Sequence, residues 1–175
     1  MKRLFLVLMA VMAFFIAGCS SAPEKPSVSF EVMDEEALSN DRQKAVVMVS
    51  EKVSNQQLEE IAKYYVAKES EDKYISDCYV SFTDTDEDGI PYTLGQVKWN
   101  SKEEKFTENN LRADSKDWST RPTKEEYELY DDLLDYLRES DLDEDAATAA
   151  FAAERNTSVE AVNAAFEKVT LWIMG

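Results

Sequence analysis

Apolar and polar residues alternate over residues 28–32. A period of two predicts a β-strand with one buried face. The acidic residues at 34–36 predict a connector, and the more apolar stretch 44–49 predicts a second strand. We expect these two strands to pair as a hairpin.

Helical spacing replaces this pattern at residues 54–68. Ser54 followed by Gln57 is the capping-box signature of a helix start. Apolar residues then recur three and four positions apart, which predicts an amphipathic helix; they are Leu58, Ile61, Ala62, Tyr65 and Val66. Two β-rich stretches at 74–82 and 92–99 predict further strands.

The C-terminal part of the chain is predicted to be helical. Residues 103–122 have no regular period and predict a connector. A second capping box at 123–126 begins a helix that we expect to end near residue 139. An Ala-rich helix centred on Phe151 follows acidic residues that suit the positive end of its dipole. A third helix is expected to begin with the capping box at 157–160.

These patterns predict an α+β fold, with a two-layer β-β-α-β-β domain at 28–102 and a three-helix bundle at 123–175. The first part resembles small β-β-α-β-β domains of uncharacterised bacterial proteins, through "SFEVMDEEAL", "QKAVVMVSEKVSNQQLEEIAKYYV" and "DCYVSFTDTDEDGIPYTLGQVKW". That resemblance implies no catalytic residues. In those domains a short Pro or Gly turn joins the last two strands, whereas this chain has a longer acidic loop.

The N-terminus has the pattern of a secretory leader. Positive residues at 2–3 precede an apolar run over 4–16, which is too short to span a membrane as a helix. The run ends in Ile16-Ala17-Gly18-Cys19.

That tetrapeptide resembles the lipobox of bacterial lipoproteins. The resemblance implies a signal peptide at 1–18, cleavage between Gly18 and Cys19, and fatty-acyl chains such as palmitate on Cys19. Two or three chains anchor a protein far more firmly than one. A plain secretory leader cut after Gly18, with a free Cys19 thiol, is the alternative. Residues 19–27 are expected to form a tether.

The expected location is the cell envelope, with the folded part anchored to a membrane through its N-terminal lipid. Ser20 is not the aspartate that resembles an inner-membrane retention signal, which favours the cell outer membrane. Whether the folded part faces the periplasm or the outside is left open, as is the oligomeric state.

Composition excludes several kinds of site. The chain is acidic, with a formal net charge of −17, and contains no histidine. The lack of histidine rules out Ser-His-Asp and Cys-His nucleophilic sites and most catalytic zinc sites. Cys78 is the only cysteine besides Cys19. We expect it to be a small buried hydrophobic residue on a strand, with a reactive thiol as the alternative.

The acidic loop contains the one candidate metal site. Asp84, Asp86 and Asp88 followed by Gly89 match the first half of an EF-hand calcium loop. Gly95 stands where that loop has a bidentate glutamate, and the flanking segments predict strands. We therefore expect no cofactor and a turn in which Asp and Gly serve the backbone, with a weak calcium site as the alternative.

Residues 146–169 have the helix, turn and helix spacing of a DNA-binding helix-turn-helix. The second helix, however, exposes Glu160 and Glu167 and only one cation, Lys168. With the negative net charge, this predicts helix packing and no nucleic-acid partner.

The sequence thus predicts a non-enzymatic lipoprotein that binds an envelope protein or a cell-wall component. One alternative is a calcium-dependent binding module that uses Asp84, Asp86 and Asp88. The other is a carboxylate-based hydrolase of envelope glycans or peptides. No pair of acids stands out for that chemistry, because the chain has 36 of them.

Overall fold

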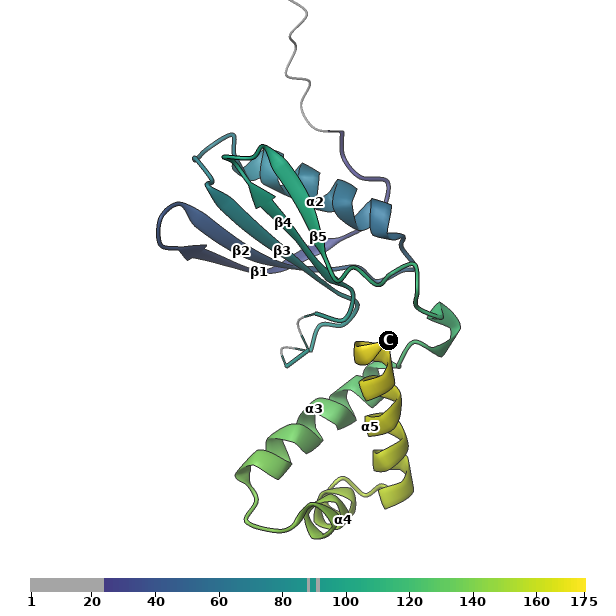
Figure 1. The fold of residues 1–175 in the computed structure, drawn as a ribbon. Coiled ribbons are helices and arrows are strands. Elements are labelled where there is room, and N and C mark those ends of the chain that lie inside the picture. Colours follow the sequence, from purple (N-terminus) through teal and green to yellow (C-terminus); the bar gives the residue numbers. More distant parts are fainter. Residues whose placement is uncertain (1–23, 88, 91) are drawn as a thin grey trace, which may run out of the picture.

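The computed structural model describes residues 24–87, 89–90 and 92–175. This part of the chain has an α+β fold with one five-stranded sheet and four α-helices (Figure 1). In chain order the elements are β1 (Glu31–Leu38), β2 (Arg42–Met48), α2 (Asn55–Glu69), β3 (Asp77–Thr83), β4 (Gly95–Asn100), β5 (Lys105–Asn109), a 3-10 turn η1 (Trp118–Thr120), α3 (Lys124–Glu139), α4 (Glu144–Glu154) and α5 (Val159–Met174). None of the helices in this described part has the length and hydropathy of a membrane span.

The strands lie in the order β1-β2-β3-β4-β5. Neighbouring strands run antiparallel except β2 and β3, which are parallel and are connected by α2. Helix α2 packs against one face of the sheet, where Val47, Val80, Phe82 and Val97 are buried with Leu58. The alternate residues of each strand point to the opposite face, which α2 leaves uncovered.

The first strand differs from the prediction. It begins at Glu31, and the acids at 34–36, expected in a connector, lie within it. Because β1 is an edge strand, its outward side chains remain in water and tolerate charge. The hairpin turn to β2 lies at Asn40 and Asp41, whose φ angles of 63° and 56° suit a type I′ turn.

A fifth strand, β5, corrects the predicted four-strand order. It lies inside the segment 103–122 that we expected to be a connector without regular structure. Its main apolar contact is the Phe106 ring, whose centroid lies 4.7 Å from that of Trp99 on β4. A short edge strand with one inward aromatic residue gives no clear period, which is why the sequence pattern missed it.

The helix starts agree closely with the predicted caps. Ser54 and Thr123 each form a capping box with the residue three positions later, as predicted. Asp143 caps α4, and acids occupy its first turn. The third prediction was off by one residue, because Ser158, not Thr157, caps α5 and accepts from the Ala161 N–H.

The three C-terminal helices contact one another, with α3 against both α4 and α5. One apolar cluster contains Leu133, Phe151 and Val162. A second contains Tyr127, Val169, Trp172 and Ile90, and Ile90 belongs to the loop between β3 and β4. That loop extends from the sheet toward α3 and α5 (Figure 1).

Candidate functional site

The acidic loop, residues 84–94 between β3 and β4, carries the residues that the sequence singled out. Asp84 directly follows the last residue of β3 and is buried, with 1% of its surface exposed. A carboxylate without water is stable only when its oxygens accept hydrogen bonds from other donors. The surroundings of Asp84 supply these donors.

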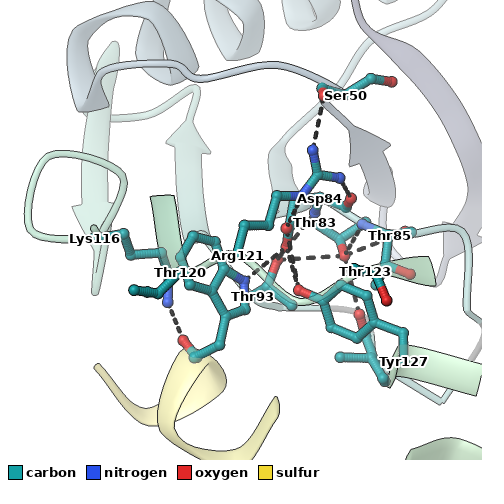
Figure 2. A network of polar contacts seen from close by, with 12 residues as sticks. Ser50, Thr83, Asp84, Thr85, Thr93, Lys116, Thr120, Arg121, Thr123 and Tyr127 are labelled. Atoms are coloured by element: carbon teal, nitrogen blue, oxygen red, sulfur yellow. Dashed lines mark hydrogen bonds and ion pairs between the residues drawn. The ribbon is translucent and has the colours of Figure 1, made fainter. Parts of the chain in front are cut away.

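Four side chains donate to the Asp84 carboxylate (Figure 2). Thr93 of the same loop donates its hydroxyl at 2.5 Å, and the Arg121 Nε donates at 2.7 Å. Tyr127 of α3 lies 3.1 Å from both carboxylate oxygens, and the Trp172 indole N–H of α5 donates at 3.1 Å. We call these five residues the Asp84 cluster.

Arg121 links the cluster to a further part of the chain. Its guanidinium donates to the backbone carbonyl of Asp84 and, at 2.8 Å, to the carbonyl of Ser50 (Figure 2). Ser50 lies between β2 and α2, and Arg121 lies just before α3. A charge-assisted bond of this kind is stronger than a neutral one, so the cluster connects the sheet, the acidic loop and two C-terminal helices.

Burial and the neighbouring Asp84 carboxylate raise the pKa of the Tyr127 phenol above its usual range. The phenol therefore keeps its proton and remains a donor at any physiological pH. Together with the guanidinium of Arg121, this makes the cluster a charged acceptor surrounded by protonated donors.

The last turn of α5 is also held by cations. Lys116 donates to the Trp172 carbonyl, and Arg112 donates to the Ile173 carbonyl. Cations at this position complement the negative end of the helix dipole. Burial and the nearby Arg112 lower the pKa of Lys116 to about 8. Its ammonium also lies 4.4 Å from the centroid of the Trp172 ring.

The candidate calcium ligands of the alternative interpretation do not converge in the part of the loop that the structure describes. Asp84 points inward to the cluster, whereas Asp86 is exposed and forms an ion pair of 2.9 Å with Lys124. The hydrogen bond from Lys124 lowers the pKa of Asp86. Asp88 lies outside the described residues. Among the residues that are described, no three acids or other metal-ligating side chains gather in one place.

Gly95, at the position of the missing glutamate, has a packing role. Its φ angle is +99°, a region that residues with a Cβ rarely adopt. A Cβ built at this position would lie 2.3 Å from the Asn110 carbonyl oxygen. The glycine therefore lets β4 begin beside the backbone that follows β5.

A groove of about 460 Å³ lies beside the acidic loop. It adjoins the sheet face that α2 does not cover. Lys44 and Val46 point to this face, because they alternate along β2 with the buried Ala45 and Val47. Its lining comes from β1, β2, the end of β3 and the loop, and consists of Met33, Asp34, Lys44, Ala45, Val46, Thr83, Thr85, Asp86, Glu87 and Tyr92.

Acidic side chains outnumber basic ones in the lining of this groove. Lys44 forms an ion pair of 3.0 Å with Glu36, and Asp86 pairs with Lys124. Burial raises the pKa of Glu87, and the like charges of Asp86 and Glu128 raise it further. The groove thus combines apolar side chains with carboxylates.

Sequence reasoning found the acidic loop but missed its partners. Arg121 lies in the segment predicted to be a connector, and the sequence pattern predicted no hydrogen-bonding role for Trp172. The signal for a buried anion was weak, because one Asp among many acids gives no sign that donors 37 and 88 residues away will reach it. Gly18 and Cys19 of the predicted lipid attachment lie outside the described residues.

Comparison with known proteins gives no family for this chain. No protein-family model, no curated protein and no solved structure matches it.

Proposed function

We propose that the protein is a lipoprotein of the cell envelope whose folded part binds another envelope component without catalysing a reaction. The anchor is supported by Ile16-Ala17-Gly18-Cys19 directly after an apolar leader. A lipid on Cys19 would hold the folded part close to a membrane, because the tether at 19–27 is short. The outer membrane is the proposed location, on the basis of Ser20.

The arrangement around Asp84 is the main support for a binding function without catalysis. This buried carboxylate accepts hydrogen bonds from four side chains of the protein, so its lone pairs are used in contacts that stabilise the fold. A general base or nucleophile would need access to substrate, and Asp84 has none.

Cys78 is a second buried group that is unsuited to chemistry. Burial raises the pKa of Cys78 to about 12, and the side chain is completely covered on β3. The thiolate is the nucleophilic form of cysteine. Cys78 therefore supports the sheet as a small hydrophobic residue, as the sequence predicts.

We further propose that the chain is organised as a two-layer sheet-and-helix domain followed by a three-helix bundle. Separate apolar clusters under α2 and between α3, α4 and α5 support this division. In this arrangement the Asp84 cluster fastens the two parts together through one polar contact region, whose donors come from both sides.

Metabolic labelling with an alkyne fatty acid tests the anchor. Wild type should incorporate the label and fractionate with membranes, whereas Cys19→Ser should lose both properties. Cys78→Ser is the matched control, because it removes the only other cysteine and should keep both. Unlabelled wild type, or a Cys19→Ser variant that still takes up label, would overturn the proposal of a lipid on Cys19.

A further inference from the structure

We propose that the groove between β1, β2 and the acidic loop is a docking site for a cationic, extended peptide segment of a partner protein. This inference rests on the proposed function, because it assigns the surface through which the anchored protein binds. It is carried by the shape, the apolar surface and the charge of the groove.

The groove offers apolar contacts at its margins. Met33 is 40% exposed and Tyr92 is 43% exposed, and both line the groove together with Val46. Large exposed apolar and aromatic side chains beside a hollow are typical of binding surfaces. An extended peptide can place one aliphatic or aromatic side chain against these residues.

The charge of the groove favours a cation in the partner. Asp34 and Glu87 line the groove, and neither forms an ion pair with any described residue. The lysine of the groove, Lys44, is already paired with Glu36. Two carboxylates are therefore available to lysine or arginine side chains of a partner, and the net charge of −17 steers such a partner toward the chain.

The surroundings of Glu87 also favour a cationic partner. Its pKa is raised by burial and by its acidic neighbours, which means that its negative charge is unfavourable in the unbound protein. A partner cation next to Glu87 would relieve that repulsion and favour the ionised form. Binding should therefore be accompanied by a lower pKa of Glu87.

The groove is preformed, which reduces the cost of binding. The Thr83 hydroxyl donates to the Ile90 carbonyl at 3.1 Å, and Ile90 packs against the helices. Asp84 fixes the start of the same loop from the inside. The Glu87 N–H donates to the Thr85 hydroxyl and the Glu87 carbonyl accepts from the Ile90 N–H, so the backbone of Glu87 is held on both sides.

A peptide fits these features better than a metal ion does. Asp34 and Glu87 come from different elements of the groove, and the described residues contain no cluster of three metal-ligating side chains. A calcium ion takes six to eight oxygen ligands and has no use for Met33 or Tyr92. Anionic lipid head groups and nucleic acid are disfavoured by the like charge.

Fluorescence anisotropy with the full-length protein in a non-ionic detergent tests this site. The probe is a labelled heptapeptide that alternates lysine with phenylalanine and valine, and its counterpart has glutamate in place of lysine. Wild type should bind the lysine peptide and not the glutamate peptide. The double variant Asp34→Asn/Glu87→Gln should weaken binding at least tenfold. The matched control Glu103→Gln/Glu108→Gln removes the same charge at the β4–β5 hairpin, where both residues are exposed, and should change the affinity less than twofold.

A charge-reversed pair, Asp34→Lys/Glu87→Lys, completes the test and should bind the glutamate peptide in preference. Failure of wild type to bind the lysine peptide, or equal weakening in the groove variant and its control, would overturn the site. Calcium that binds with the same dependence on Asp34 and Glu87 and displaces the peptide would overturn the choice of a peptide partner. Because the anchor is tested by labelling of Cys19, failure of the docking site leaves that result unchanged, and the reverse also holds.

Discussion

The Trp172 indole N–H donates to the carboxylate of Asp84 over 3.1 Å, although the two residues are 88 positions apart. Asp84 directly follows β3, and Trp172 lies in the last turns of α5. This bond holds the final helix against the acidic loop between β3 and β4. The Trp172 ring also packs against that of Trp118 with centroids 5.6 Å apart, so the contact is both polar and apolar.

Replacing Asp84 by asparagine should be strongly destabilising. The amide has nearly the same shape, but it cannot supply the charge that Arg121 requires, and its NH₂ group faces donors. Removing one partner of a buried ion pair costs about 3 to 5 kcal/mol, and the partly exposed Arg121 places the expected loss near the lower value. Urea unfolding followed by circular dichroism measures it. Asp86→Asn is the matched control and should change stability by less than about 0.5 kcal/mol, because Asp86 and Lys124 are exposed.

Gly95→Ala should destabilise the chain by more than a typical glycine replacement. The positive φ of Gly95 is unfavourable for alanine by about 1 kcal/mol, and the new Cβ would also collide with the Asn110 carbonyl. Gly175→Ala provides the comparison. Gly175 is exposed after the last residue of α5, and a Cβ at that position would lie 3.1 Å from the Leu171 carbonyl oxygen, a much milder contact. Equal effects of the two substitutions in the same unfolding assay would show that the backbone of Gly95 is not constrained.

Cys78 should make the protein less stable at alkaline pH. In the unfolded chain a thiol loses its proton near pH 9, whereas in the folded chain the pKa of Cys78 is about 12. Between these values the unfolded state has released a proton that the folded state retains, so stability falls as pH rises, by up to about 1.4 kcal/mol per pH unit. Below pH 9 the full contribution is present.

The measurement is urea unfolding between pH 8 and 11 in a Cys19→Ser background, which leaves a single thiol. Cys78→Ala should show a shallower decline than its parent. Tyr65 and Tyr127 contribute in the same direction, because burial raises the pKa of both phenols. Both proteins contain these tyrosines, so the difference between their declines in stability is due to Cys78. Rapid reaction of native Cys78 with Ellman's reagent at pH 8 would contradict its burial.

Calcium should have little effect on stability through the acidic loop. A ligand stabilises a protein only when it favours the folded state, and Asp84 is already occupied by four donors. We expect the thermal midpoint in millimolar calcium to match that in millimolar magnesium. An increase specific to calcium that Asp86→Asn abolishes would instead favour the calcium-dependent module.

The elements with a strong local signal could be predicted from the sequence. The capping boxes at Ser54 and Thr123 gave the starts of two helices, because a cap depends on residues only three positions apart. The burial of Cys78 followed in the same way from the alternation along its strand. Strand β1 was misplaced because its acids at 34–36 suggested a loop, whereas an edge strand can carry them.

The candidate site depended on contacts that no local pattern records. The sequence identified Asp84 and Asp86 together as potential ligands, yet they point in opposite directions, one buried and one exposed. Whether an aspartate turns inward is decided by Arg121, Tyr127 and Trp172, which come from the far end of the chain. The groove likewise forms from strands and a loop that only the fold brings together.

A double-mutant cycle between Asp84→Asn and Trp172→Phe tests whether Asp84 joins the acidic loop to the last helix. Trp172→Phe removes the indole N–H and keeps an aromatic ring, and Leu171→Ala on the exposed side of the same helix is the control. We expect the two substitutions to be coupled by about 1 kcal/mol in the free energy of unfolding. Additivity within about 0.3 kcal/mol would contradict it and would mean that Asp84 and Trp172 stabilise the chain independently.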